Sequence, residues 1–256
     1  MRHASVTRVL LRRAGLRRPF PPDFASRIEG RGIRAVERRG KYLLVALSSG
    51  DTLVMHLGMS GSFRVLPRGG HDDAADKHDH VVFELSNGAI VTFNDPRRFG
   101  VMDVIGTSDA PDAAGGVAAL GPEPLSRAFD AAALARACTG KRVALKVALL
   151  DQRIVAGVGN IYASEALYRA RLSPRRRAST IATAAGKPTP AAAGLVAAIK
   201  ETLRDAIAQQ ARPSHSGRFL VYEREGERCH RRGCGGKVRR VTQAGRSTYY
   251  CPRCQK

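Results

Sequence analysis

Short runs of apolar residues separated by turn residues run through the first hundred positions of the chain. Residues 41–58 hold two such runs around a Ser-Ser-Gly-Asp turn, and residues 80–95 hold two more around an Asn-Gly pair. An Asn-Gly pair supplies the positive φ angles that a tight hairpin turn requires. Residues 6–13 form a further, basic run of strand type. Successive short hairpins predict an antiparallel β-sandwich over residues 1–110.

The spacing of the apolar residues becomes helical after a linker rich in Gly, Ala, Asp and Pro at residues 106–121. Asp130 is positioned to cap a helix that Gly140 closes. Residues 142–151 and 159–172 have the spacing of two further helices. We therefore predict an α+β protein whose strands precede its helices.

A last long helix is predicted to begin at Thr189 as N-cap, with Pro190 in its first turn. Its apolar stripe, which we assign to core packing, consists of Leu195, Ile199, Leu203 and Ile207. The Ala-, Ser- and Thr-rich residues 176–189 before it predict a mobile loop. The helical domain is expected to span residues 120–212.

The chain is strongly basic, with 43 Lys and Arg against 22 Asp and Glu, a net charge of +21 and a pI of about 10.9. So large an excess indicates a polyanionic partner, either nucleic acid or an anionic membrane. The longest apolar runs, such as residues 42–47, are far shorter than the roughly 20 residues of a spanning helix. We therefore favour nucleic acid and expect a monomer with no membrane association.

The N-terminal residues bear on localisation. The first 22 residues contain six arginines and no acid, a weak likeness to an organellar transit peptide, and a basic strand is the preferred interpretation. Nothing there resembles the apolar core of a secretory signal peptide. We therefore expect a cytoplasmic protein rather than an organellar one.

Four of the five cysteines lie in the last 28 residues. Cys229 and Cys234 are separated by four residues, Cys251 and Cys254 by two, and sixteen residues lie between the pairs. Two such pairs suit a closed tetrahedral zinc site, and the alternating residues between them suit a hairpin. Four unliganded thiols are the alternative. We predict one structural Zn²⁺ per chain in a zinc β-ribbon at residues 220–256.

Two further features suit phosphate binding. Arg246 follows an Ala-Gly turn at the tip of the predicted ribbon, although a tip arginine is often only a solvated turn residue. Gly157 and Gly159 precede a predicted helix, where free amide groups and close backbone approach can hold a phosphate. A plain helix-start loop is the simpler interpretation of these glycines. His230 is a conceivable zinc ligand, but four cysteines already suffice.

Seven features in the same order carry a resemblance to a known family. They are KYLL, MHLGMSG, KHDH, NDPRRFG, LGPEPL, GVGNIYASEAL and the C-terminal cysteine pairs. Together they resemble the formamidopyrimidine-DNA glycosylase/endonuclease VIII family, and its formamidopyrimidine-DNA glycosylase members most closely, over residues 6–256. The resemblance implies a β-sandwich, a helix–two-turn–helix domain and a zinc ribbon. It also implies a glycosylase and AP lyase that removes oxidised purines, including 8-oxoguanine and formamidopyrimidines, from damaged double-stranded DNA.

The resemblance gives an explanation for the exposed sequence Arg97-Arg98-Phe99. Members of the family flip the damaged nucleotide out of the helix and fill the gap with side chains. Met59, Arg97 and Phe99 match the three residues that fill this gap. A guanidinium can pair with the orphaned base, and a phenyl ring can wedge between base planes. The alternative is that Phe99 is a core residue and Arg97 a surface charge.

Other residues match single positions of the family. The resemblance implies catalytic roles for Lys41, which touches phosphate beside the lesion, for Glu165 near the active centre, and for Arg246 in the final elimination. It implies DNA contacts for four more residues, which are His78, Lys141, Lys146 and Asn160. Lys146 would be the nearest of them to the lesion.

The first residues depart from the family pattern. Members begin Pro-Glu, and the proline amine attacks the sugar and forms a Schiff base, whereas this sequence begins Met1-Arg2 and has no Pro-Glu pair nearby. Three explanations are open: a misassigned start, which we favour, a chain prepared without its first segment, or a damaged-DNA-binding protein that does not catalyse. Lys41 is a conceivable substitute amine, but nothing in the sequence shows that it is desolvated.

Two smaller departures concern the C-terminal third. The first cysteine pair is wider than in many relatives, although a wider pair still closes a tetrahedron. Residues 206–227 are shorter than the family's loop over flipped 8-oxoguanine, which leaves the preferred lesion open. A general zinc-ribbon protein that binds nucleic acid, including RNA, without regard to lesions is a further alternative.

Overall fold

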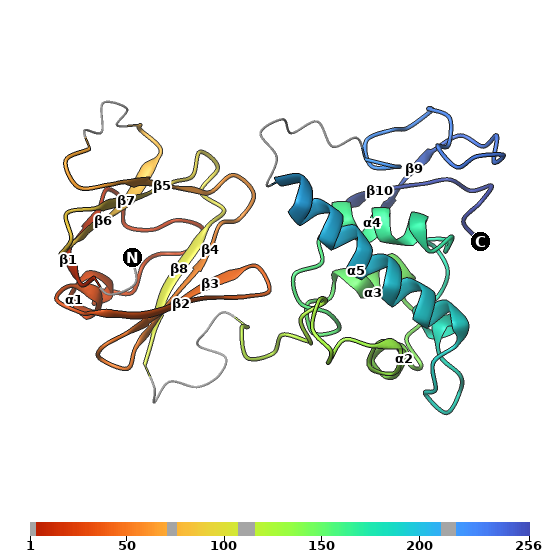
Figure 1. The fold of residues 1–256 in the computed structure, drawn as a ribbon, viewed down its shortest axis with the longest axis horizontal. Coiled ribbons are helices and arrows are strands. Elements are labelled where there is room, and N and C mark those ends of the chain that lie inside the picture. The colour runs from red at the N-terminus through yellow and green to blue at the C-terminus, as the bar shows by residue number, and fades with distance from the viewer. Residues whose placement is uncertain (1–3, 71–75, 107–115, 211–218) are drawn as a thin grey trace. The chain divides into compact units, whose positions relative to one another are not determined.

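The chain folds into two compact units, which divide between residues 119 and 120. The computed structural model describes residues 4–70, 76–106, 116–210 and 219–256 (Figure 1). Met1 and Arg2, and part of the segment over which the lesion-covering loop is shortened, lie outside these residues. Among the helices that are described, none is both long enough and apolar enough to cross a membrane.

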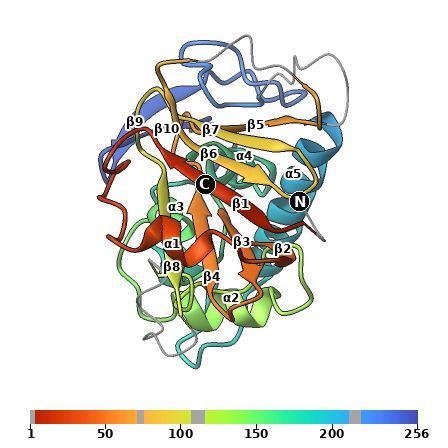
Figure 2. The ribbon, with the colours of Figure 1, turned by 90° about the vertical axis from the view of Figure 1, so that its left-hand side faces the viewer.

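The first unit contains two four-stranded antiparallel sheets. The first sheet has the order β1 (Val6–Leu11), β6 (Asp79–Leu85), β7 (Ile90–Asn94) and β5 (Ser62–Leu66), and Figure 2 shows β1 lying beside β6. The second has the order β2 (Ile33–Arg39), β3 (Tyr42–Leu47), β4 (Thr52–His56) and β8 (Val101–Ile105). The predicted sandwich and both predicted hairpins are confirmed.

Alternate residues of these strands form one core. Val45, Leu53 and Phe93 are nearly inaccessible and belong to the same apolar cluster, as the period of two residues in a strand requires. A short helix, α1 (Phe24–Ile28), adds its first and last residues to this core. The sequence predicted only strands here. One turn of helix is too short to produce a helical repeat of apolar positions, so α1 was missed.

The second unit is helical apart from its C-terminal hairpin. Its helices are α2 (Ala131–Cys138), α3 (Leu145–Leu150), α4 (Asn160–Arg169), the 3₁₀ turn η2 (Ala178–Ile181) and α5 (Pro190–Gln210). In Figure 1, the long blue helix α5 lies along α4, with which it packs. The core between these elements includes Leu134, Leu149, Leu167 and Leu195.

Local signals set the limits of most of these helices. The Asp130 carboxylate accepts a hydrogen bond from the amide of Ala133 at 2.7 Å, which confirms the predicted cap of α2. Helix α3 starts at Leu145 rather than at residue 142, because Ala144 is extended and pairs with Arg177. A tertiary pairing of this kind cannot be read from the spacing of apolar residues.

Two predictions about the second unit were wrong, one on α5 and one on the segment before it. Ile207 is 58% exposed, so the buried stripe of α5 ends before it, although Leu195 and Ile199 are buried. Residues 176–189 do not form a mobile loop: Ala178 and Ile181 are fully buried in the helical core. Two apolar side chains in a polar segment gave too weak a pattern for this packing to be predicted.

The C-terminal hairpin is a ribbon of two strands, β9 (Arg239–Gln243) and β10 (Arg246–Tyr250). Ala244 and Gly245 join them with φ angles of 47° and 71°, as a tight two-residue turn requires. Val238 and Tyr249 of the ribbon pack in a small apolar cluster with Tyr168 of α4. The predicted ribbon is confirmed, and it shares a core with the helix that carries Asn160.

Candidate nucleic-acid interface and metal centre

Two neighbouring loops of the first unit present the three side chains that the sequence singles out for gap filling. We call residues 57–61 and 96–100 the loop pair. Met59 is 72% exposed and Phe99 is 40% exposed, and the guanidinium carbon of Arg97 lies 4.7 Å from the centre of the Phe99 ring. Phe99 is therefore not a core residue, and large apolar groups and a cation stand together on the surface.

The backbones of the loop pair are in direct contact. Gly58 has a φ angle of +68°, and a Cβ atom there would lie 2.5 Å from the carbonyl carbon of Phe99. Any other residue would force the loops apart, because real Cβ atoms do not approach so closely. The glycine therefore brings Met59 next to the turn that carries Arg97 and Phe99.

Lys41 and His78 lie on other turns of the same unit. Lys41 is exposed between β2 and β3, and its charge helps to lower the pKa of His56, although burial is the larger cause. The Nδ1 atom of His56 accepts a hydrogen bond at 2.9 Å from the amide of Gly58, which belongs to the loop pair. His78 is half-buried just before β6, and its ring meets that of His80 edge to face.

In the second unit, three predicted contact residues come together from α3, α4 and β10. Lys146 is fully buried, and its Nζ atom donates a hydrogen bond to Oδ1 of Asn160. The side-chain amide of Asn160 donates to the carbonyl oxygen of Ser247 at 2.9 Å. Burial, and secondarily the charge of Arg246, lowers the pKa of Lys146 to about 8. The site therefore combines the Lys146 amine, whose pKa is lowered, with the Asn160 amide and the exposed Arg246 guanidinium.

The beginning of α4 has the features of an anion-binding site. Its N-cap is Gly159, and no side chain caps the first turn. Gly157, with a φ angle of +77°, is held by a hydrogen bond from its amide to the side chain of Gln152. Uncapped amides at a helix start attract phosphate groups. Asn160 is the first residue of this helix, so the site adjoins the Lys146–Asn160 pair.

Positive charge is concentrated in the second unit. Residues 120–256 contain 26 Lys and Arg against 9 Asp and Glu, whereas residues 1–119 contain 17 against 13. Lys141 adds to this charge from an exposed turn after α2. A polyanion would therefore meet its strongest attraction at the helices and the ribbon.

Glu165 occupies a buried position and not an open site. It is 4% exposed, and its carboxylate accepts three backbone hydrogen bonds, at 2.8 to 3.0 Å, from Leu220, Val221 and Tyr222. Both oxygens are thereby engaged in tying the segment before the ribbon to α4. This geometry suits a residue that positions a segment better than one that exchanges protons with a substrate.

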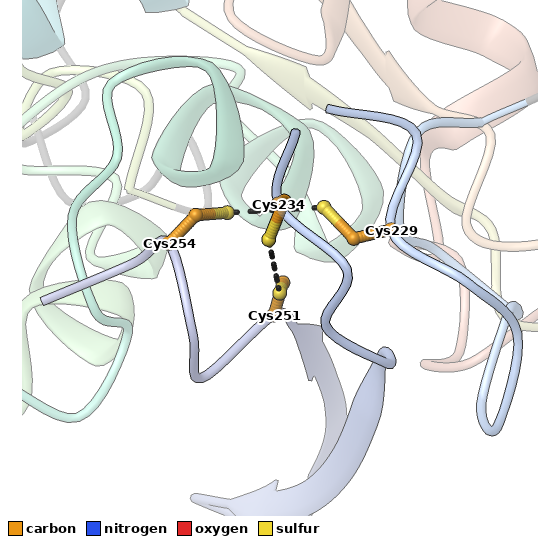
Figure 3. A group of neighbouring side chains, drawn as sticks. All are labelled: Cys229, Cys234, Cys251 and Cys254. Carbon is orange, nitrogen blue, oxygen red and sulfur yellow. Dashed lines mark hydrogen bonds between the residues drawn. The ribbon is translucent and has the colours of Figure 1, made fainter. Parts of the chain in front are cut away.

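The four C-terminal cysteines form one cluster, as Figure 3 shows. Their sulfur atoms all lie within 4.8 Å of one another, with Cys234 and Cys251 at 3.6 Å and Cys229 and Cys254 at 3.8 Å. A tetrahedral zinc ion with Zn–S bonds of about 2.3 Å would separate its sulfurs by about 3.8 Å. The cluster thus fits the predicted metal, and His230 is not part of it.

Tyr168 links this cluster to α4, which the sequence did not predict. Its hydroxyl lies 3.2 Å from Sγ of Cys229, and the Arg231 guanidinium lies 5.0 Å from the centre of its ring. Arg231 also donates to the Tyr168 carbonyl oxygen at 2.7 Å. Hydrogen bonds to a metal-bound thiolate orient the ligand. No local signal marks Tyr168, because its partners lie far along the chain.

Comparison with known families divides the chain into three matched parts. Residues 1–102 match the formamidopyrimidine-DNA glycosylase N-terminal domain, and residues 120–216 match the H2TH domain of the same enzymes. Residues 226–256 match the zinc finger found in FPG and IleRS. The last match agrees with the cysteine cluster and assigns it one structural zinc ion.

Individual relatives match over nearly their whole length. The formamidopyrimidine-DNA glycosylase of Rhodopseudomonas palustris (strain BisA53) is 52% identical over 280 residues, covering 100% of this chain and 94% of that protein. The crystal structure of MutM (Fpg) from Thermus thermophilus has a TM-score of 0.81 and 37% identity and covers 100% and 92% of the two chains. Lactococcus lactis Fpg in complex with a FAPY-dG containing DNA has a TM-score of 0.82 and 26% identity and covers 99% and 93%.

Proposed function

The chain belongs to the formamidopyrimidine-DNA glycosylase family, and we propose on that premise that it is a DNA glycosylase and AP lyase that excises oxidised purines from duplex DNA. The relatives match the whole chain, and one of them is described in complex with DNA that contains a formamidopyrimidine lesion. The observation that carries the proposal for this chain is the exposed cluster of Met59, Arg97 and Phe99.

This cluster provides what base extrusion requires. A base that leaves the stack must be replaced, because an open gap costs stacking energy of a few kcal/mol. Met59 and Phe99 supply apolar groups that can pack against neighbouring base planes, and Arg97 supplies donors for the orphaned base. We assign His78 and Lys41, which lie on other turns of the same unit, to contacts with the DNA backbone, Lys41 beside the lesion.

The second unit holds the backbone of the damaged strand. Asn160 and the uncapped start of α4 bind one phosphate, and the charge of Arg246 adds to that site. Lys146, with its lowered pKa, lies next to Asn160 and carries a proton that can be lost near neutral pH. Arg246 assists the elimination that cleaves the strand, and Lys141 extends the contact along the backbone.

Two further groups position this machinery. Glu165 holds residues 220–222 against α4 through three amide hydrogen bonds. Cys229, Cys234, Cys251 and Cys254 hold the zinc ion, which crosslinks the two ends of the ribbon when bound. The ribbon then presents Arg246 at a fixed place beside Asn160. The bacterial relatives and the high positive charge support action on DNA in the bacterial cytosol.

The proposal is tested with a labelled duplex that contains a single 8-oxoguanine opposite cytosine. The chain is expected to release the base, nick the strand and, with borohydride present, form a covalent adduct. Peptide mapping of the adduct by mass spectrometry identifies the attacking amine. Lesion-selective binding without adduct or nick would contradict the enzyme and indicate a damaged-DNA-binding protein. Equal affinity for lesion duplex and undamaged duplex would contradict both the enzyme and the damaged-DNA-binding protein.

A further inference from the structure

A fully buried carboxylate, that of Asp95, lies beneath the loop pair at the end of β7. Its Oδ1 atom accepts a hydrogen bond from the Ser60 hydroxyl at 2.6 Å, and its Oδ2 atom accepts one from the amide of Gly100 at 2.8 Å. Ser60 follows Met59, and Gly100 follows Phe99. One side chain therefore bonds to both members of the loop pair, next to the residues proposed to enter DNA.

The backbone of Asp95 brings in a third loop. Its amide donates to the carbonyl oxygen of His78 at 3.0 Å, and its carbonyl oxygen lies 2.9 Å from Nε2 of His80. The same carbonyl accepts from the amide of Arg98 at 3.1 Å. Hence the proposed phosphate contact His78 and the loop pair are fixed to the same residue.

The Ser60 hydroxyl makes a second bond that joins the loops. It donates to Asp95 and accepts from the amide of Arg97 at 3.3 Å, which one hydroxyl group can do at the same time. The residue after Met59 is thus bonded to the backbone of Arg97 itself. We call the Ser60 hydroxyl and the Asp95 carboxylate, with their mutual hydrogen bond, the Ser60–Asp95 link.

Stability alone does not account for this arrangement. Burial of a carboxylate carries a desolvation cost that its hydrogen bonds only offset, so well-packed apolar residues often stabilise a fold equally well. The sandwich already has an apolar core built from its strands. What the link adds is a defined geometry for two exposed loops, which apolar packing does not specify.

We propose that Ser60 and Asp95 are positioning residues that preorganise Met59, Arg97 and Phe99 for entry into the duplex, an inference that rests on the proposed function. Loops that must order on binding lose affinity through the entropy of ordering. Loops already held in the bound geometry avoid that loss. The link therefore acts on lesion engagement and leaves the contacts with undamaged DNA backbone unchanged.

The test compares Ser60→Ala with the matched control Ser86→Ala, whose hydroxyl accepts from the amide of Ser5 in the same unit. The probe is a duplex with a tetrahydrofuran abasic site beside 2-aminopurine, whose fluorescence rises when a side chain disrupts the stack. Ser60→Ala is expected to lower the insertion equilibrium about tenfold, as loss of one hydrogen bond to a charged group implies. Ser60→Thr, which keeps the hydroxyl, is expected to restore it, and Ser86→Ala to match wild type.

Affinity for undamaged duplex and the melting temperature complete the test. Affinity for undamaged duplex is expected to be the same in Ser60→Ala as in Ser86→Ala. The melting temperature of Ser60→Ala is expected to fall by only a few degrees, so the variant stays folded at the assay temperature. The double variant Ser60→Ala/Asp95→Asn is expected to lose no more insertion than Asp95→Asn alone, because the residues act as one link. Wild-type insertion by Ser60→Ala, or a parallel loss of undamaged-DNA binding, overturns the inference. A wild-type chain with no fluorescence change overturns the proposed function instead.

Discussion

The guanidinium carbon of Arg97 lies 4.7 Å from the centre of the Phe99 ring, so the two residues form a cation–π pair on an exposed turn. At an exposed site such a pair contributes only about 0.5–1 kcal/mol. It therefore holds the ring only weakly in place. In a duplex both groups find better partners, the ring between bases and the guanidinium at a base edge, so the pair can separate at small cost.

Phe99→Ala is expected to reduce excision at 8-oxoguanine strongly while leaving the fold intact. The ring is 40% exposed, so its loss should change the free energy of unfolding by less than about 1 kcal/mol. Loss of a base-stacking side chain is expected to cost about 1–3 kcal/mol of lesion engagement, which is roughly 5- to 150-fold. Single-turnover excision and thermal melting measure the two effects. Val65→Ala, at another exposed apolar residue of the same unit, should leave excision at the wild-type rate.

Arg97→Ala is expected to weaken binding to lesion duplex more than binding to undamaged duplex. The guanidinium is proposed to meet the orphaned base, which exists only after a nucleotide has left the stack. Titration of both duplexes at one salt concentration measures the ratio. Equal losses on the two duplexes would show that Arg97 contacts only the phosphate backbone.

Lesion binding is expected to weaken between about pH 7 and 9.5. Burial lowers the pKa of Lys146 to about 8, so its charge is lost well below the usual lysine range. The neighbouring Arg246 opposes its protonation, and Asn160 accepts its hydrogen bond in either form. Lys146→Met should bind more weakly at pH 7 and show no decrease up to about pH 9.5. Lys141→Met, at the exposed turn, should retain the decrease in lesion binding with pH. If Lys146→Met showed the same pH profile as the wild type, the decrease would belong to another group.

The lowered pKa of Lys146 also affects stability, in the opposite direction: stability increases with pH where lesion binding decreases. The folded pKa is lower than the ordinary lysine pKa of 10.5, so between about pH 8 and 10.5 the unfolded chain binds more protons at this lysine than the folded chain. The contribution of Lys146 to the free energy of unfolding therefore increases as pH rises through that window. Urea unfolding at about pH 8 and 10 should show this increase in the wild type relative to Lys146→Met.

Cys251→Ser is expected to lose the bound zinc ion and, with it, DNA affinity. Its sulfur is one of four that lie within 4.8 Å of one another, and three remaining thiolates cannot close the structural site. Zinc content measured on the purified protein should fall from one per chain to well below one. Cys138→Ala is the control, because that thiol is buried in the helical core and its pKa is raised to about 11. Unchanged zinc in Cys251→Ser would refute the ligand assignment.

Glu165→Gln is expected to reduce the free energy of unfolding by about 2 kcal/mol or more, because an amide group would face backbone donors that now meet a carboxylate. Denaturant unfolding measures this change. Glu201→Gln, which removes a largely exposed partner of Arg169, should cost less than about 1 kcal/mol. A Glu165→Gln chain with wild-type stability but no excision would support a direct catalytic role instead.

Features set by residues close in sequence were predictable. The cap at Asp130 and the ribbon turn at Ala244 each depend on a few consecutive positions, and the four cysteines fall into two closely spaced pairs. The structure contains all three features. Helix α1 and the true start of α3 were not predictable. The first is a single turn set by the core around it, and the second depends on pairing with residue 177, far along the chain.

The residues of the candidate site were likewise predictable only in part. The sequence of the turn marked Arg97 and Phe99 as unusual, and the resemblance to the family added Met59 and the gap-filling role of all three. The partners that position them were not visible, since Ser60 and Asp95 are 35 residues apart and neither is unusual where it stands. Nor does the sequence reveal that Lys146 is buried and that Glu165 is fully engaged, because burial depends on the packing of several elements.

The most direct measurement is a crystal structure of the chain bound to a duplex with one tetrahydrofuran abasic site. Met59 and Phe99 are expected to lie within the stack at the gap, with Arg97 hydrogen-bonded to the unpaired base and Asn160 at a neighbouring phosphate. A complex in which the loop pair remains in solvent, away from the abasic site, would contradict it.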